Sequence, residues 1–377
     1  MGGVPLTESV TALAELTTLR VGGRPTRLVV CATTDGLVEA ARRTWADGDD
    51  WLVVGGGSNL LAADAGFPGT VLLVRTRGVE VVPDGSDAVR LRVAAGEPWD
   101  DLVARTVERG WTGLEALSGI PGTTGASPVQ NVGAYGVEVG DVLAAVEFLD
   151  ADTGERAWLP VDELGLGYRT SVFKRGRRGV VLTVEFRLGL ADGRGVPVRY
   201  PQLATALAVE LGAAVAPTAV RSAVLGLRAA KGMVLDPTDA DTASAGSFFT
   251  NPIVSPTFAA TLPLDAPRWP VAPDAAPAVV PLGSAPAAPP TVPDERVKLS
   301  AAWLIEHAGV HRGFALPGSR AAVSSKHTLA LTNRGGASAS EVAELARYVQ
   351  TMVMTRFGVA LVPEPVVVGD LLDSVPD

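Results

Sequence analysis

Two glycine-rich segments have the composition of loops that bind anionic oxygens. Residues 120–136 read Ile-Pro-Gly-Thr-Thr-Gly-Ala-Ser-Pro-Val-Gln-Asn-Val-Gly-Ala-Tyr-Gly, and residues 55–61 read Gly-Gly-Gly-Ser-Asn-Leu-Leu. Glycine lets the backbone adopt positive φ and lets a ligand approach the main chain. Consecutive N–H groups in such a turn form a concave anion site. Ser127, Gln130 and Asn131 add side-chain donors. Each segment alone is also typical of a surface connection, but two together suit a ligand that contains a pyrophosphate.

Several other motifs with known chemistry do not occur in the sequence. There is no Gly-x-Ser-x-Gly nucleophile elbow, and residues 55–59 lack the Gly-Lys-Ser/Thr of a P-loop. They also do not form Gly-x-Gly-x-x-Gly, so a Rossmann nicotinamide site is not indicated. His307, His311 and His327 lack the paired spacing of metal ligands. We interpret them as surface or hydrogen-bonded histidines and expect no metal site.

Length and composition indicate a folded protein of two or three domains. The chain has 377 residues, 47% of them hydrophobic, and a net charge of −9. This charge argues against non-specific binding to nucleic acid, so an anionic ligand needs a local basic cluster. No apolar run approaches the roughly 18 residues of a membrane helix, and no export signal is visible. Cys31, the only cysteine, is expected to be a small buried residue. We expect a cytoplasmic monomer without membrane insertion.

Hydrophobic periodicity predicts a mixed α+β fold with alternating layers. Strands are expected at residues 27–31, 51–54, 71–74, 89–93, 142–149, 180–187 and 329–332, with a strand-turn-strand over 359–368. Helices are expected at residues 35–46, 99–109, 202–211, 218–231, 298–308 and 340–357, with Asp35 and Ser340 as N-caps. Residues 263–293 hold ten of the 28 prolines. Because proline removes an N–H donor and fixes φ, we expect an exposed, mobile insertion there rather than a helix or central strand.

Five short motifs follow one another along the chain. They are Gly55-Gly-Gly-Ser-Asn-Leu; Ile120-Pro-Gly with Gln130-Asn-Val-Gly-Ala-Tyr-Gly; Tyr168-Arg-Thr-Ser-Val-Phe-Lys; Ala245-Gly-Ser-Phe-Phe-Thr-Asn-Pro; and Leu361-Val-Pro-Glu. Their order closely resembles the UDP-N-acetylenolpyruvoylglucosamine reductase family, flavoenzymes of peptidoglycan precursor synthesis. The resemblance covers roughly residues 17–369, apart from the proline-rich segment.

The resemblance implies both a fold and a reaction. The fold would be an FAD-binding region of the vanillyl-alcohol-oxidase (PCMH) type in two subdomains, residues 1–75 and 76–220, followed by a C-terminal α/β substrate-binding domain, residues 221–377. The reaction would be the NADPH-dependent, FAD-mediated reduction of UDP-N-acetylglucosamine enolpyruvate to UDP-N-acetylmuramate. FAD, bound noncovalently, would accept a hydride from NADPH and pass it to the vinyl CH2 carbon of the substrate.

The resemblance also implies roles for individual residues. Arg169 matches the family's arginine beside the substrate carboxylate, where a fixed cation stabilises developing negative charge. Glu364 matches the acid beside the same carboxylate and would have to be protonated or hydrogen-bonded. Ser247 matches the proton donor to C2, and it needs a relay or a nearby cation, for which Lys231 is a candidate. The expected substrate contacts are Tyr135, Tyr168, Tyr200, Lys231 and Asn251. The expected cofactor contacts are Gly55, Gly56, Gly57, Ser58, Asn59, Leu60, Pro121, Gly122, Thr123, Gly125, Ala126, Ser127, Gln130, Asn131, Gly133 and Ala134.

One departure from the family pattern concerns the end of the last motif. The family commonly has Glu-Val-Arg where this chain has Glu364-Pro365-Val366, so a cation near the site is missing. Two other functions remain open at this point. A flavin oxidase of the same superfamily often tethers FAD through His or Cys, but Cys31 and the histidines lie outside the glycine segments. A UDP-sugar-binding regulator with a vestigial flavin site would not need the three residues of the expected catalytic set together.

Overall fold

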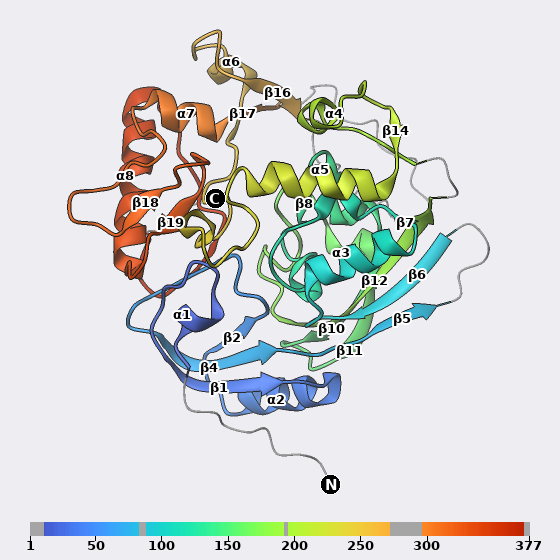
Figure 1. Cartoon of the computed structure of the whole chain (residues 1–377). Helices are drawn as coiled ribbons and strands as arrows, with labels where there is room; N and C mark the ends of the chain where they lie inside the picture. The colour runs from blue at the N-terminus through green and yellow to red at the C-terminus, as the bar shows by residue number, and fades with distance from the viewer. Residues whose placement is uncertain (1–10, 83–87, 192–194, 272–295, 373–377) are drawn as a thin grey trace, which may run out of the picture.

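The computed structural model describes residues 11–82, 88–191, 195–271 and 296–372 (Figure 1). The N-terminal part forms a parallel sheet in the order β1 (Pro25–Cys31), β4 (Phe67–Val74) and β2 (Trp51–Val54). Helix α2 (Thr34–Ala46) packs along this sheet, and Leu37, Ala41 and Leu72 are buried between them. The expected N-cap Asp35 is corrected to Thr33, whose side chain accepts a hydrogen bond from the Gly36 N–H at 3.1 Å. Asp35 instead lies in the first turn, where its charge favours the helix dipole.

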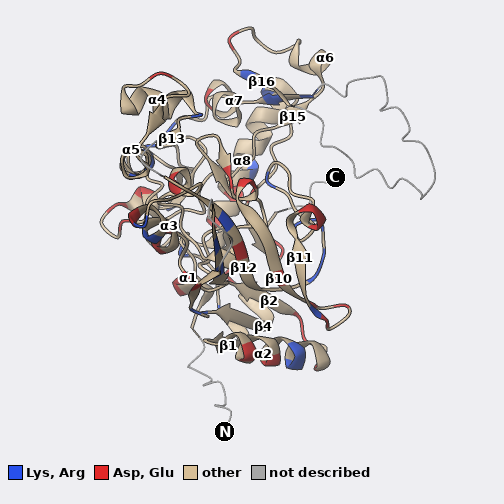
Figure 2. Cartoon of the chain, turned by 90° about the vertical axis from the view of Figure 1, so that its right-hand side faces the viewer, with Lys and Arg blue, Asp and Glu red and all other residues tan. Residues whose placement is uncertain are grey.

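The largest sheet is antiparallel and carries the central part of the chain. Its order is β11 (Arg156–Pro160), β10 (Leu143–Asp150), β12 (Gly179–Leu190), β6 (Ala88–Ala94) and β5 (Val79–Val82), with β7 (Trp111–Thr112) also paired to β12. Helix α3 (Trp99–Glu108) covers one face, and the buried rings of Trp99 and Phe186 meet edge-on. Charged residues of neighbouring strands pair across the sheet, as with Glu185 and Arg92 at 2.7 Å, and red and blue segments appear together near β12 (Figure 2).

A small unit follows with a core of its own. It contains β13 (Val196–Pro197), α4 (Pro201–Leu207), β14 (Ala214–Val215) and α5 (Pro217–Ala229) around a core that includes Val198, Leu203 and Val224. The domain boundary expected at residue 220 falls inside α5. Both helices end earlier than expected, because Ala208 takes a left-handed conformation and Gly232 follows α5 with φ 66°.

The C-terminal part packs around α8 (Ala339–Phe357) and α7 (Ala301–His307). It contains the hairpin of β18 (Ala321–Val323) and β19 (Leu331–Asn333), and the short helix α6 (Pro256–Ala259). The cap of α8 is Ser338 rather than Ser340, because the Ser338 side chain accepts from the Glu341 N–H at 3.1 Å. The helix expected from residue 298 begins at Ala301, since Ser300 caps it and residues before it form a strand.

A three-stranded antiparallel sheet has the order β15 (Ile253–Val254), β17 (Arg296–Leu299) and β16 (Arg268–Val271), and its strands β17 and β16 lie beside α7 at the top of Figure 1. The expected insertion therefore does not begin at residue 263, because residues 268–271 pair with β17 along its outer edge. Proline has no N–H to donate to a neighbouring strand. An edge strand such as β16 tolerates Pro270, because only one of its two sides is paired. The rest of the expected insertion lies outside the described residues.

The last strand of the described chain pairs with a strand of the N-terminal part. β20 (Val366–Val368) pairs in parallel with β3 (Leu60–Ala62), immediately after the first glycine segment. Residues 359–363 do not form the strand expected there. They lie against the 248–250 loop, where the Thr250 N–H donates to Val362 O at 3.0 Å. Helices of the described ranges are all too short or too polar to cross a membrane. The mixed α+β fold is confirmed.

Candidate active site

The two glycine segments lie directly against each other, although more than 60 positions separate them. Ser58 Oγ donates to Pro121 O at 2.9 Å, across 63 positions of the sequence. A Cβ atom at Gly56 would lie 2.6 Å from Gly122 Cα, and one at Gly55 would collide with the Thr123 side chain. Gly122 itself has φ 127°. The glycines are therefore required both for backbone conformation and for the close approach of the two loops.

The paired loops form one wall of a cavity of about 630 Å³. The first loop follows strand β2, and a short 3-10 turn at Thr124–Ala126 lies within the second. Gln130 accepts a hydrogen bond from Asn59 Nδ2 at 2.6 Å, so the loops are tied side chain to side chain as well. Residues of both loops, of the basic segment 169–178 and of the C-terminal part line this cavity, including Arg169, Lys174, Ser247 and Glu364.

Arg169 and Glu364 form an ion pair in the wall of this cavity. Arg169 Nε lies 3.2 Å from Glu364 Oε1, and their side chains are 20% and 14% exposed. Arg169 Nη2 also donates to Gly133 O at 2.8 Å, and its backbone has φ 56°. Burial raises the pKa of Glu364, and the positive charges of Arg169 and Lys174 oppose that rise. A guanidinium held in this way keeps part of its planar fork available to a second carboxylate.

A second cavity of about 580 Å³ adjoins the first. It is lined by all five expected substrate contacts, Tyr135, Tyr168, Tyr200, Lys231 and Asn251. The rings of Tyr135 and Tyr200 meet edge-on at 5.7 Å, and Lys231 Nζ donates to Gln202 Oε1 at 2.9 Å. Burial and the nearby Arg228 charge lower the pKa of Lys231.

Five residues line both cavities: Gly133, Arg169, Arg228, Met233 and Ser247. Arg169 and Ser247, from different parts of the sequence, therefore lie where the two spaces meet. Ser247 is half-buried, and within the described residues its hydroxyl has no hydrogen-bond partner in the protein. The neighbouring Phe248 N–H donates to Leu329 O at 2.7 Å, and Phe248 O accepts from Glu364 N–H at 2.9 Å. The serine loop and the acid are thus held to one another through the backbone.

Most of the expected cofactor residues line the first cavity, and three do not. Gly125 lines a smaller apolar cavity of about 290 Å³ beside it, and Ala134 lines the second cavity. Asn131 lines none of these cavities and is 2% exposed. Its side chain donates to Glu138 Oε2 at 2.6 Å and to Gly167 O at 3.1 Å. It braces the segment that carries Arg169.

Several lining residues were not predicted as site residues from the sequence, among them the basic residues Lys174, Arg228, Lys298 and His327. Lys298 Nζ lies 4.7 Å from the Tyr168 ring centroid. Arg228 Nη2 donates to Met233 O at 2.8 Å, while its buried Nε has no hydrogen-bond partner among the described residues. Lys174 Nζ donates to Glu364 O at 3.3 Å. The one available signal was that Lys174 ends the motif that begins at Tyr168.

The chain matches two family models. Residues 25–159 match a model described as an FAD binding domain, and residues 236–368 match the C-terminal domain of UDP-N-acetylenolpyruvoylglucosamine reductase.

Several full-length proteins and one solved structure are similar to this chain. A UDP-N-acetylenolpyruvoylglucosamine reductase of Leifsonia xyli is 57% identical over 370 residues, covering 95% of this chain and 98% of the relative. One from Salinispora arenicola is 49% identical, covering 95% and 94%. The crystal structure of the Thermus caldophilus enzyme has a TM-score of 0.62 and 25% identity, covering 97% of this chain and all of the other.

Proposed function

The chain belongs to the UDP-N-acetylenolpyruvoylglucosamine reductase family, and from this membership we propose how its residues carry out the reaction. It is a flavin-dependent oxidoreductase, a UDP-N-acetylmuramate dehydrogenase. It reduces UDP-N-acetylglucosamine enolpyruvate to UDP-N-acetylmuramate in peptidoglycan precursor synthesis, with FAD as cofactor and NADPH as hydride donor. The observation that carries the residue roles is the meeting of two cavities at Arg169 and Ser247.

The first cavity fits FAD by shape and chemistry. The glycines let the two loops pack directly against each other, both loops line the cavity, and backbone N–H groups in such glycine turns suit a pyrophosphate. FAD bound there would supply the transfer of a hydride from NADPH to the substrate. We assign its binding to the expected residues that line this cavity, from Gly55–Leu60 and from the second loop. Asn59, whose amide is engaged by Gln130 and by Glu364 O, holds the loops together.

The second cavity fits the UDP-sugar. Its aromatic walls, Tyr135, Tyr168 and Tyr200, provide faces for sugar and base. Its cations, including Lys231 and Lys298, provide partners for the diphosphate. The enolpyruvyl group then lies where the cavities meet, with its carboxylate against Arg169.

Each of the three expected catalytic residues has a different role at that junction. Arg169 binds the substrate carboxylate and stabilises the negative charge that develops on it. Glu364, whose pKa is raised by burial, can hold a proton and donate a hydrogen bond to the same carboxylate. Ser247 delivers a proton to C2, and the nearby cations Arg228 and Lys231 compensate for the low acidity of a serine hydroxyl.

Anaerobic absorbance spectroscopy tests the activity directly. NADPH should bleach the flavin of the purified protein, and addition of UDP-N-acetylglucosamine enolpyruvate should restore the oxidised spectrum. Reoxidation by oxygen but not by the enolpyruvyl substrate would support the oxidase alternative instead.

We expect FAD to be bound noncovalently. Cys31 is 3% exposed, lies in β1 away from the cavities, and burial raises its pKa to about 11. A thiol that stays protonated is a poor nucleophile for tethering a flavin. None of the histidines lines the first cavity. Acid precipitation should release yellow flavin into the supernatant, and flavin that stays in the pellet would contradict the expectation.

Gly56→Ala should weaken FAD binding. The added Cβ would lie 2.6 Å from the Gly122 backbone, so the two loops must move apart. Overpacking of this kind costs about 1–3 kcal/mol, which corresponds to about 5- to 150-fold weaker binding. Flavin fluorescence during dialysis or titration measures the change. Gly226→Ala in α5 is the matched control, because no atom lies within 4 Å of its added Cβ; equal FAD loss in both variants would refute the loop contact as the cause.

We also propose that the enzyme acts as a monomer in the cytoplasm. The buried single cysteine is compatible with a reducing compartment. Mass photometry of the holoenzyme and fractionation of the source cells test the two parts separately.

A further inference from the structure

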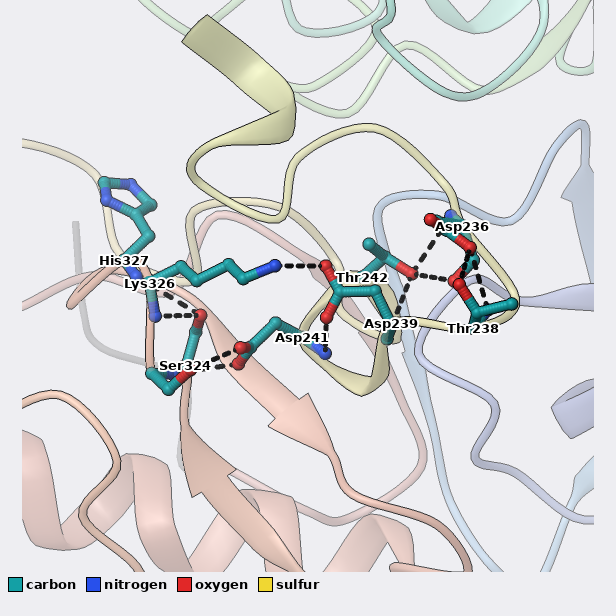
Figure 3. A network of polar contacts seen from close by, with 9 residues as sticks. Asp236, Thr238, Asp239, Asp241, Thr242, Ser324, Lys326 and His327 are labelled. Atoms are coloured by element: carbon teal, nitrogen blue, oxygen red, sulfur yellow. Dashed lines mark hydrogen bonds and ion pairs between the residues drawn. The ribbon is translucent and has the colours of Figure 1, made fainter. Parts of the chain in front are cut away.

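A network of polar contacts ties the segment 236–242 to the turn 324–328 between β18 and β19 (Figure 3). Lys326 Nζ lies 2.6 Å from Asp239 Oδ2. Ser325 donates to Asp241 twice, from its N–H at 2.8 Å and from its hydroxyl at 2.6 Å. Each half of the network is anchored by a different acidic residue, so the turn cannot slide along the segment without losing both contacts.

The same turn is also fixed from within and from the other side. Ser324 Oγ accepts hydrogen bonds from the N–H groups of Lys326 at 3.0 Å and His327 at 3.2 Å. On the far side, the Thr328 hydroxyl donates to Glu306 of α7. The backbone of His327 is therefore held on both flanks. Its imidazole is half-buried and lines the second cavity, the proposed UDP-sugar site.

Several positive charges lie near His327 in the second cavity. Burial, then the charges of Lys231 and Arg228, lower the pKa of His327 to about 4. Glu306 acts in the opposite direction, and Arg312 adds a further lowering effect. On its own element, Lys326 is paired with Asp239 and points into the network of Figure 3. At neutral pH the imidazole is uncharged, although it lies in a cavity that suits an anionic ligand.

We propose that His327 takes up one proton from solution when the diphosphate of the UDP-sugar binds in the second cavity, and that it then holds this anion as an imidazolium. The inference rests on the proposed function, because it needs a diphosphate in that cavity. A bound dianion reverses the field of Lys231 and Arg228 at the ring, so the charged form becomes favourable. The diphosphate is esterified at both ends and does not titrate near neutral pH, so the proton goes to the protein.

The sign of the pH dependence follows from this linkage. The pKa of His327 is higher in the complex than in the free enzyme, so affinity increases as pH falls through the pKa of the complex. If the complex restores an ordinary value of about 6.5, affinity at pH 6.0 should be about fourfold higher than at pH 7.5. Other titratable groups that line this cavity can contribute to the pH dependence of the affinity. They are Glu138, whose pKa is raised by burial, and the cations Lys231, Lys298 and Arg199. A His327 variant is therefore needed to isolate the imidazole.

Isothermal titration of the holoenzyme provides the test. UDP-N-acetylglucosamine is the first probe, because it has the diphosphate but no enolpyruvyl carboxylate to perturb Glu364. UDP-N-acetylglucosamine enolpyruvate is the second. Measurements at pH 6.0 and 7.5, in two buffers of different ionisation enthalpy, give the protons taken up per ligand. Wild type should take up protons at pH 6.0 and bind more tightly there, whereas His327→Gln, with unchanged FAD content, should lose both effects.

His311→Gln is the matched control, since His311 is exposed and lines neither cavity. It should behave as wild type. Proton uptake that is absent in wild type, or that persists in His327→Gln, overturns the inference, and in the second case Glu138 becomes the acceptor. These outcomes leave the proposed function intact as long as the enolpyruvyl substrate binds; failure of both UDP-sugars to bind would instead overturn the proposed function together with the inference.

Discussion

Ser247→Ala should leave FAD binding and flavin reduction by NADPH near wild-type values and slow flavin reoxidation by the enolpyruvyl substrate by about 10²- to 10⁴-fold. Only the second half-reaction needs a proton at C2 of the substrate. Ser247 lies at the junction of the two cavities, and its hydroxyl makes no hydrogen bond to another group among the described residues. Stopped-flow absorbance of the flavin in separate anaerobic half-reactions measures both steps.

Two further variants make the serine result interpretable. Ser247→Cys retains a proton donor of similar size and should recover part of the reoxidation rate. Thr250→Val removes a hydroxyl from the same loop, one that contacts Val362 O at 3.4 Å and lines neither cavity. It should have little effect. If Ser247→Ala slows both half-reactions equally, the serine is structural; if it slows neither, the proton comes from Lys231 or water.

Arg169→Met should slow the same half-reaction by about 10²- to 10³-fold, the usual cost of losing a group that stabilises developing charge. The substitution also leaves Glu364 without the cation 3.2 Å away, so the pKa of Glu364 should rise further. Single-turnover reoxidation at saturating substrate separates this loss from weaker binding, and the flavin spectrum reports whether the cavity itself has changed.

The matched control is Arg175→Met, which removes an exposed cation from the same basic segment. Arg175 contacts Gly165 O at 3.0 Å and lines neither of the two cavities. Arg169→Lys should fall between wild type and Arg169→Met, because an ammonium keeps the charge but cannot bridge Gly133 O and two carboxylates with a planar fork. Wild-type reoxidation in Arg169→Met would show that another cation, with Lys174 the nearest candidate, stabilises the charge.

Features that depend on local sequence were predictable. Strand 51–54 runs directly into Gly55, so the first loop and its position at a strand end follow from periodicity and from glycine chemistry. The order of the motifs was enough to bring Arg169, Ser247 and Glu364 together. The caps of α2 and α8 were placed two residues late, since several Ser, Thr and Asp residues precede each helix and only the three-dimensional turn selects one.

Features that depend on which way a side chain points were not predictable. Gln130 and Asn131 are neighbours in one motif, yet Gln130 lines the first cavity while Asn131 is buried as a brace. The motif contains residues that line the cavity and residues that support the fold, so the motif alone does not show which residue has which role. His327 has no local signal either, because its position in the cavity comes from a turn fixed by Asp239 and Asp241, more than 80 residues earlier.

The parallel pairing of β20 with β3 has a consequence for synthesis on the ribosome. Asn59 reaches Glu364 O at 3.3 Å across 305 positions of the chain. Both glycine loops therefore leave the exit tunnel long before the strand that fixes the catalytic acid. Until then the edge of β3 offers unpaired N–H and C=O groups, which are a hazard for association with other nascent chains.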